Sequence, residues 1–151
     1  MSARAVGSRS GSLGRLGVAA AAIGGGAITI LGVSLSWFSL FAGLQPYRGV
    51  DLLNGRLLAA GGFLSIVAGA WFSVRAGRPL RWGIGLLGFA LLAFASWSGL
   101  QLRVIYRDLA ADPLMVVRLG PGLIVALTGA LVIFASFFLA DEAGAPGDTK
   151  T

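Results

Sequence analysis

The chain alternates between long apolar stretches without charge and short polar segments that hold nearly all of its charged residues. The charge-free stretches cover residues 16–47, 57–74, 82–102 and 119–140. A helix needs about 20 apolar residues to cross a hydrocarbon core of about 30 Å. Each stretch meets or approaches that length, so the pattern predicts an all-α protein, an integral membrane four-helix bundle.

The residues at the ends of the stretches indicate where each span begins and ends. The first stretch is longer than one span needs, and Gln45–Pro46 closes it because proline cannot continue a helix. We expect spans at about residues 17–41, 57–74, 82–102 and 119–140. A cleaved signal peptide is the alternative for the first stretch. That stretch is longer than the apolar core of a signal peptide, about 7–15 residues, and no clean small-residue cleavage site follows it.

The distribution of arginine and lysine predicts the orientation, because short cytoplasmic loops carry an excess of these residues. Arg75, Arg78 and Arg81 lie within one short connection that contains no acid, whereas the loops on the opposite side mix arginine with aspartate. We therefore expect both termini in the cytoplasm. We expect a disordered basic tail at residues 1–14, a transmembrane domain at residues 15–140 and a disordered acidic tail at residues 141–151.

The tryptophans fit this orientation as interfacial belts, in which amphipathic rings sit at the membrane surface. Trp37 and Trp97 fall near the outer ends of their spans. Trp71 and Trp82 fall near the inner ends. The pattern predicts an aromatic belt at each membrane surface, and Tyr47 and Tyr106 also fall near the outer one.

Small residues spaced four apart predict the faces on which the helices pack, since they let two backbones approach closely. The ladders in the second and fourth spans are the candidate helix-packing sites, and they consist of Gly61, Ser65, Gly69, Gly122, Ala126 and Ala130. They can pack within one chain, or against a second copy or a partner. Gly24-Gly25-Gly26 also leaves open a break in the first span.

Two connections carry local signals. In the first outer loop, Asn54-Gly55 is a turn signal, and Arg48 and Asp51 can pair. The segment Arg103–Arg118 continues the third span or forms a short helix on the membrane, and Asp112-Pro113 resembles a helix start. Its apolar residues are either lipid anchors or a candidate partner surface, formed by Ile105, Leu109, Leu114 and Val117.

Composition excludes most other classes of protein. Hydrophobic residues make up 56% of the chain and charged residues only 12%, against about 25% charged in an average soluble domain. There is no cysteine and no histidine, which excludes disulfides, thiol chemistry and histidine-ligated metals. The net charge of +6 comes mainly from membrane-proximal arginines, so no nucleic-acid partner is needed to explain it.

Reactive groups are missing from the predicted spans. No ionisable residue lies well inside a span, although such residues usually mark ion pathways and proton relays. The serines and threonines there have no base at matching depth. Residues 83–88 match the letters of a dinucleotide-binding loop, but no strand precedes them. We expect no catalytic residue, cofactor or metal site, and no enzymatic activity.

The chain resembles the small four-span membrane proteins of unknown function that are common in high-GC actinobacteria. The features that carry the resemblance are Trp37, Gly49-Val50-Asp51, Gly55 and Gly120-Pro121-Gly122-Leu123. The resemblance implies a four-span fold and a bacterial plasma membrane, and it implies no activity.

Two functions remain open at this stage. The first is a non-catalytic multi-pass membrane protein that acts as an accessory or assembly subunit of a larger membrane system, with the lipid bilayer and a membrane protein or a homo-oligomer as partners. The second is a small oligomeric channel or transporter for a neutral solute, lined by a polar seam of Ser34, Ser36, Ser96 and Ser98.

Overall fold

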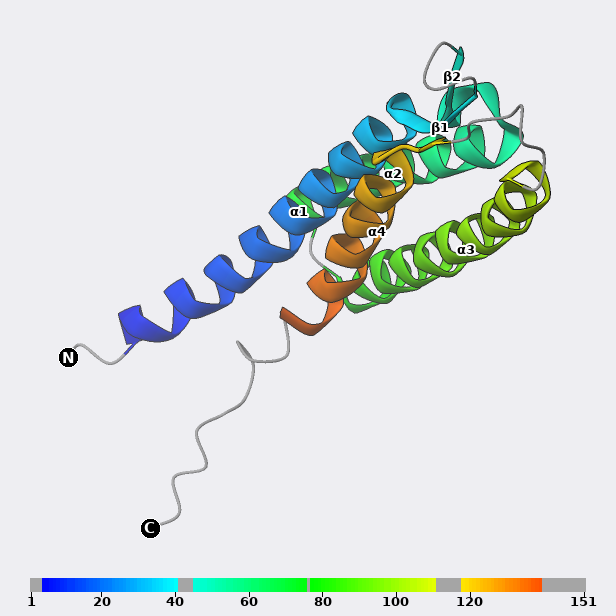
Figure 1. Ribbon diagram of the computed structural model, residues 1–151. Helices are drawn as coiled ribbons and strands as arrows, with labels where there is room; N and C mark the ends of the chain where they lie inside the picture. The colour runs from blue at the N-terminus through cyan, green and yellow to red at the C-terminus, as the bar shows by residue number, and fades with distance from the viewer. Residues whose placement is uncertain (1–3, 41–44, 76, 111–117, 140–151) are drawn as a thin grey trace.

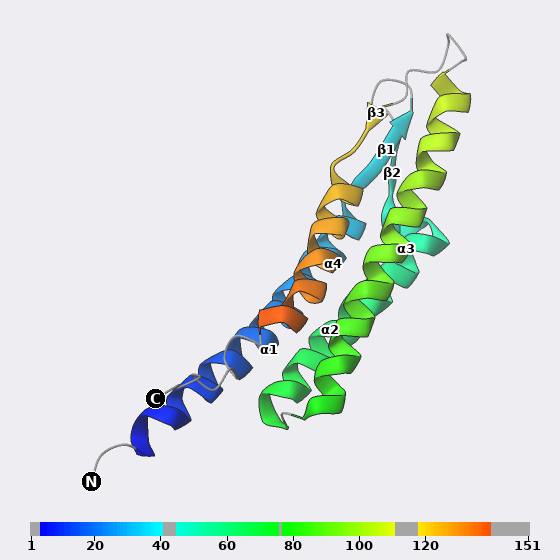
Figure 2. The same ribbon diagram turned by 90° about the horizontal axis from the view of Figure 1, so that it is seen from below.

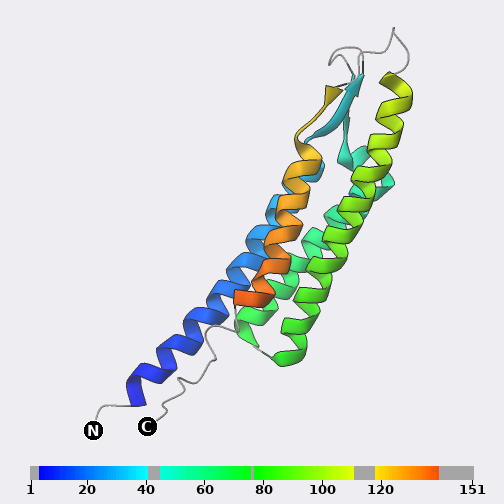
Figure 3. The ribbon, with the colours of Figure 1, turned by 60° about the horizontal axis from the view of Figure 1, so that its bottom comes forward.

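The computed structural model describes residues 4–40, 45–75, 77–110 and 118–139. Within them lie four helices, namely α1 (Arg4–Ser34), α2 (Leu53–Val74), α3 (Arg78–Ala110) and α4 (Gly122–Leu139). The helices run side by side along the long axis of the molecule (Figure 1). Figure 3 shows the adjoining ends of α2 and α3 at one end of the molecule, which we call the turn end, and the short strands at the other, the sheet end.

Three helices are long and apolar enough to cross a membrane, namely Gly14–Ser34, Leu53–Val74 and Arg78–Val104. The apolar part of α4, Gly122–Phe138, is shorter. More than half of the surface of Phe63 on α2 and of Phe89 on α3 is exposed. Such exposure is unfavourable in water and ordinary in lipid. The described part of the protein is predominantly helical, and the length and the apolar surface of three of its helices suit them to crossing a membrane.

An antiparallel sheet of three strands lies at the sheet end (Figure 2). Its central strand β1 (Ser36–Leu40) pairs with β2 (Gln45–Arg48) and with β3 (Arg118–Leu119). Phe38 stacks on Tyr47, with 4.8 Å between the ring centroids. The sheet adds strands to a fold that the sequence predicted as all-α.

The sheet also corrects the first predicted span, residues 17–41, because α1 ends at Ser34. The five residues that follow Leu35 form β1 instead of helix. Part of β1 pairs with β3, which is about 80 positions distant in the chain. A local hydropathy pattern contains no information about such a distant partner, and aromatic residues suit a strand as well as a span.

The start of α1 differs from the sequence prediction as well. The helix begins at Arg4, inside the segment 1–14 that was expected to be a disordered tail. A helix that is already nucleated gains one hydrogen bond for each further residue, so a stable span can extend beyond its apolar part. The expected acidic tail, residues 141–151, lies outside the described residues.

The start of α2 contradicts the turn predicted at Asn54-Gly55. The helix begins at Leu53, one residue after a 3₁₀ turn, η2 (Gly49–Asp51). A Cβ on Gly55 would lie 1.9 Å from the carbonyl oxygen of Gly49. Glycine thus serves here for the close approach of α2 to η2 rather than for a turn.

Two further expectations concern the loops. The Asp51 carboxylate accepts a hydrogen bond from the backbone N–H of Arg48 at 3.1 Å, rather than from its side chain. The third predicted span continues as one helix to Ala110, which decides between the two alternatives left open for that segment. The predicted helix start at Asp112-Pro113 lies outside the described residues.

Glycines on two faces of α1 bring its backbone against both neighbouring helices. Toward α2, a Cβ on Gly26 would lie 2.5 Å from the carbonyl oxygen of Gly62. Toward α4, a Cβ on Gly32 would lie 2.2 Å from the backbone nitrogen of Ala126. The helix is continuous through the glycine triplet. Gly25 and Gly26 therefore provide close packing, and they do not break the span.

Trp37 belongs to strand β1, and its side chain packs against α1, η2 and α4. Its indole is only 2% exposed and donates a hydrogen bond to the carbonyl oxygen of Gly32 at 3.2 Å. Gly49 and Gly122 lie directly against the ring. The predicted position of Trp37 in an interfacial aromatic belt is wrong, because close packing between α1, η2 and α4 encloses the indole. The other three tryptophans, Trp71, Trp82 and Trp97, are each more than half exposed.

The glycine triplet provides a test of the α1–α2 packing. Gly26→Ala should destabilise the protein by about 1–3 kcal/mol, because a methyl group would overlap the backbone of Gly62. At Gly24, no atom lies within 4 Å of the position that a Cβ would take. Gly24→Ala should therefore stabilise the helix or leave it unchanged. Thermal unfolding in detergent micelles measures both, and equal effects of the two variants would contradict the packing described.

Candidate functional site

The small-residue ladder of α2 serves two neighbouring helices. Ser65 is fully buried and donates a hydrogen bond across to the carbonyl oxygen of Ala22 on α1, at 3.0 Å. Gly69 lies on the same face, where a Cβ would be 3.0 Å from the Cβ of Ala22. Gly61 instead faces α3, because a Cβ there would meet the side chain of Leu91. All three positions therefore lie against other helices of the same chain.

The ladder of α4 lies against α1. A Cβ on Gly122 would be 2.7 Å from the carbonyl oxygen of Gly32. Ala126 and Ala130 are completely buried, and Ala126 contacts Gly32. All three ladder positions are therefore buried within the chain.

The other predicted sites are placed differently. Ile105 and Leu109 lie on α3, but their side chains fall outside the described part of the chain. Leu114 and Val117 lie wholly outside the described residues. The proposed partner surface therefore stays a prediction. The four serines of the polar seam do not share one lining surface within a single chain. Ser34 and Ser96 are exposed, Ser36 is half-buried and Ser98 is buried.

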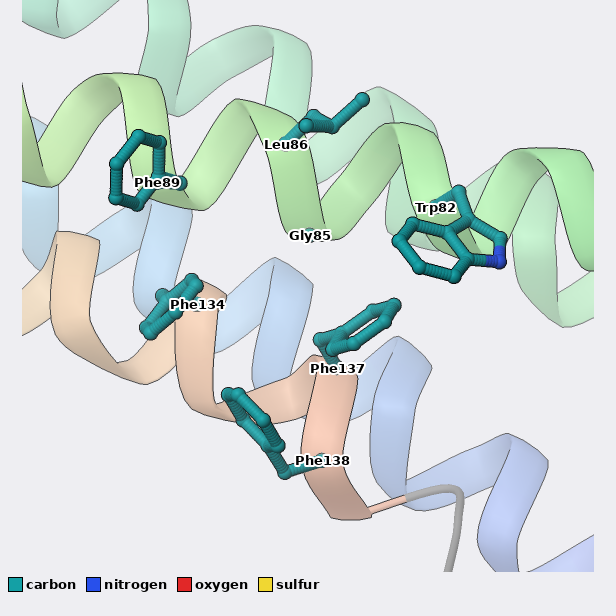
Figure 4. A pocket seen from close by; sticks show the side chains of 7 residues that line it. All are labelled: Trp82, Gly85, Leu86, Phe89, Phe134, Phe137 and Phe138. Atoms are coloured by element: carbon teal, nitrogen blue, oxygen red, sulfur yellow. The ribbon is translucent and has the colours of Figure 1, made fainter.

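An aromatic groove, which the sequence analysis did not find, opens between α3 and α4. Its volume is about 140 Å³, and it lies toward the turn end. Figure 4 shows the lining side chains, which come from one face of each helix. The lining residues are Trp82, Gly85, Leu86, Phe89, Phe134, Phe137 and Phe138. None of them carries a charge or a reactive group.

Two glycines of α3 bring α4 close enough to form this groove. A Cβ on Gly88 would lie 2.6 Å from the backbone nitrogen of Phe134, and one on Gly85 would lie 2.7 Å from the ring of Phe137. The Phe137 ring then meets Trp82 edge-on, with 4.9 Å between centroids. Two of the three glycines that imitate a nucleotide-binding loop, Gly85 and Gly88, are thus packing residues within a helix.

Arginines at the turn end bind the carboxyl ends of two helices. Arg81, at the start of α3, donates a hydrogen bond to the carbonyl oxygen of Phe137 at 3.0 Å and lies 5.1 Å from the centre of its ring. Arg15 on α1 donates to the carbonyl oxygens of Ser73 and Val74 near the end of α2. The last carbonyls of a helix lack partners within it and carry partial negative charge, which a cation stabilises.

A second cavity, which we call the outer cavity, lies at the sheet end between α2 and α3. Its volume is about 220 Å³. Its lining combines polar and apolar residues, namely Trp37, Leu52, Leu53, Asn54, Ser98, Gln101 and Leu102. The side-chain amide of Asn54 donates a hydrogen bond to the amide oxygen of Gln101 at 3.3 Å. This bond connects the first turn of α2 with α3.

The signals for the two cavities differ in the sequence. Phe134, Phe137 and Phe138 are spaced three and four apart, which places them on one helix face. This spacing could have indicated an aromatic surface on α4. For the outer cavity, Ser98 and Gln101 share a face of α3, but nothing in the sequence connects them with Asn54. Only the folded chain places these residues together.

The chain matches no family model, no curated protein and no solved structure. The case for a function therefore rests on the geometry of the described residues. Among these residues, no group of three or more acidic side chains is placed to hold a metal ion.

The contact between Arg81 and the end of α4 provides a test of the groove's support. Arg81→Gln should lower stability by about 1–2 kcal/mol, because it removes a charged hydrogen bond and a cation–π contact at a partly buried position. Arg78→Gln is the matched control, since Arg78 is exposed three residues earlier. Chemical unfolding in micelles compares the two variants. A loss of the same size in both would mean that only the overall charge of this end matters.

Proposed function

We propose that this protein is a non-catalytic, four-span membrane protein that assembles with a larger membrane system as an accessory subunit. In this proposal α4 crosses the membrane beside the three longer helices. Both termini lie in the cytoplasm, and the membrane is a bacterial plasma membrane.

The observation that carries the proposal is the open aromatic groove between α3 and α4. Its walls are rigid rings held edge-on to one another, such as Phe134 against Phe138 with 5.4 Å between centroids. From Trp82 to Phe89 the groove follows about two turns of α3, or about 10 Å. An apolar segment of a partner's transmembrane helix fits this length and chemistry. Intramolecular packing uses the small-residue ladders, whereas the groove is an exposed apolar feature with a defined shape.

The second candidate function is an oligomeric channel or transporter for a neutral solute. The observation that favours it is Ser96, whose side chain is exposed on α3 within a span. Several copies arranged around such a hydroxyl would enclose a weakly polar path. This candidate requires self-association, which the following experiment also detects.

Site-specific photo-cross-linking in native membranes tests the assembly proposal. A benzophenone analogue of phenylalanine replaces Phe89 in the groove or, as a matched control, Phe63 on α2. The two side chains are similarly exposed, at 57% and 63%. We expect Phe89 to give one defined protein adduct that co-purifies at a fixed ratio, and Phe63 to give lipid adducts.

A truncation variant makes this result specific to the groove. Phe89→Ala should reduce co-purification of the partner about tenfold, because an exposed anchor in a partner interface contributes about 1–2 kcal/mol. Phe63→Ala should leave co-purification unchanged. Lipid adducts at both positions would contradict the proposal, and adducts between copies of the chain alone would favour the channel.

A topology reporter tests the four-span arrangement. A fusion after Lys150 should be active on the cytoplasmic side, and a fusion within the loop after Tyr47 should be active on the opposite side. If both the N-terminus and the position after Lys150 are cytoplasmic, the chain must cross the membrane an even number of times. An external reading after Lys150 would exclude α4 as a span or reverse the assigned orientation.

A further inference from the structure

Four described arginines gather at the turn end, and two of them serve the fold. Arg15 donates to carbonyl oxygens near the end of α2, and Arg81 donates to one near the end of α4. The partial negative charge of these two helix ends is thereby compensated. Arg75 and Arg78 are exposed on either side of the connection between α2 and α3 (Figure 3). Their charges are therefore in excess of those that hold the helix ends.

Neither exposed arginine has a counter-ion within the described part of the chain. Arg75 lies over the ring of Trp71, 5.8 Å from its centre, and such a contact leaves the positive charge uncompensated. The side chain of Arg78 makes no ion pair, hydrogen bond or ring contact with a described residue. The described acidic residues lie elsewhere, since Asp51 belongs to η2 and Asp108 lies near the far end of α3. The counter-charge therefore lies outside the described residues.

The two arginines are close enough to act on one anion. Two residues separate them in the sequence, so their Cα atoms are at most about 11 Å apart. This distance is comparable with the Debye length of about 8–10 Å, so the two charges repel each other and both attract an anion between them. Arg78 is also the first residue of α3, where the helix N-terminus adds partial positive charge. The forked guanidinium groups suit the oxygens of a phosphate.

Two tryptophans place these arginines at the surface of a membrane. Trp71 lies one turn before Arg75, and Trp82 lies one turn after Arg78. Both indoles are more than half exposed, and so is Val74 beside Arg75. Exposed tryptophans favour the boundary between lipid headgroups and acyl chains. One helical turn is about 6 Å, which places the arginines further out, at the level of the phosphates.

From this arrangement we infer that Arg75 and Arg78 bind the headgroup phosphate of an anionic phospholipid. The indole of Trp71 lies at the level of the glycerol backbone of the same lipid. A zwitterionic lipid carries its own positive charge beside the phosphate, so the site selects phosphatidylglycerol over phosphatidylcholine. The inference rests on the proposed placement of the helices in a membrane. It does not depend on the partner proposed for the aromatic groove.

The acidic residues that follow α4 are the competing occupant of this site. Asp141 and Glu142 lie within three positions of Leu139, the last residue of α4, and they are outside the described residues. Contact between α2 and α4 is slight, so Arg75 at the end of α2 lies away from the end of α4. A lipid at the membrane surface can reach both exposed arginines together, which favours the lipid.

Native mass spectrometry of the full chain in detergent micelles tests the inference by counting bound lipids during a titration. The probes are phosphatidylglycerol and phosphatidylcholine with the same acyl chains. We expect the wild type to bind phosphatidylglycerol saturably and about tenfold more tightly than phosphatidylcholine. Arg75→Gln/Arg78→Gln should weaken phosphatidylglycerol binding about tenfold to thirtyfold, because one arginine near the surface contributes about fivefold. Phosphatidylcholine binding should be unchanged.

Arg48→Gln/Arg118→Gln is the matched control, since it removes two exposed arginines from the sheet end. It should leave the affinity for phosphatidylglycerol unchanged. Arg78→Gln alone is the second variant should the double variant fail to fold, and it should weaken binding about fivefold. Raising the ionic strength from about 0.1 M to about 1 M shortens the Debye length to about 3 Å. The preference for phosphatidylglycerol should then largely disappear.

A charge-removing variant of the tail, Asp141→Asn/Glu142→Gln, separates the lipid from the competing occupant. We expect this variant to bind phosphatidylglycerol as the wild type does. If the lipid binds only to this variant, the carboxylates of the tail occupy the arginines in the wild type, and the inference is overturned. If inorganic phosphate at constant ionic strength releases the lipid, the arginines form a site for a free anion instead.

Two further results would overturn the inference. One is equal affinity of the wild type for the two lipids, which would mean that the arginines select no headgroup. The other is an unchanged affinity for phosphatidylglycerol in Arg75→Gln/Arg78→Gln. Neither result bears on the cross-linking from Phe89 or on the topology reporter, so this inference and the proposed function fail independently.

Discussion

Direct contact between helix backbones along α1 is the constraint on which the rest of the structure depends. Gly26 faces Gly62 of α2, and Gly32 faces Ala126 of α4, at distances that leave no room for a Cβ. Lipid offers little advantage for burying apolar surface, so helices in a membrane associate mainly through close packing and interhelical hydrogen bonds. The hydrogen bond from Ser65 to Ala22 adds to the first interface. Because α1 holds α2 on one side and α4 on the other, it determines where α3 can lie.

The two cavities follow from the way α3 joins this arrangement. Glycines again bring α3 against α4, at Gly85 and Gly88, but the facing residues on α4 are phenylalanines. The rings leave an open aromatic groove beside the contact. Between α2 and α3 the packing is less extensive, and the side chain of Leu91 rather than backbone meets Gly61. The outer cavity lies between these two helices at the sheet end.

Charge stabilises the ends of the structure rather than its interior. Arg15 and Arg81 donate to terminal carbonyl groups of α2 and α4, so each joins one helix to the end of another. In the interior, hydroxyl groups satisfy backbone carbonyls instead, as Thr29 does within α1. The arginines that predict orientation therefore also hold the turn end together. Ser98 stands apart from this pattern because its buried hydroxyl oxygen has no hydrogen-bond partner among the described residues.

The sequence by itself determined the helical class and the approximate places of the helices, because apolar stretches of span length and their charged boundaries are local properties of the chain. It did not predict that residues 36–40 leave the helix, since β1 pairs with Arg118–Leu119 far along the chain. It placed Trp37 in an interfacial aromatic belt, although packing of Gly49 and Gly122 against the indole buries it. The same limit applies to the candidate sites. The phenylalanine spacing on α4 was visible, but only tertiary structure decided that Trp82 and Phe89 face it, and that Asn54 reaches Gln101 beside Ser98. Periodicity assigns a residue to a face of its own helix, whereas a cavity depends on which faces of different helices meet and how closely their backbones approach.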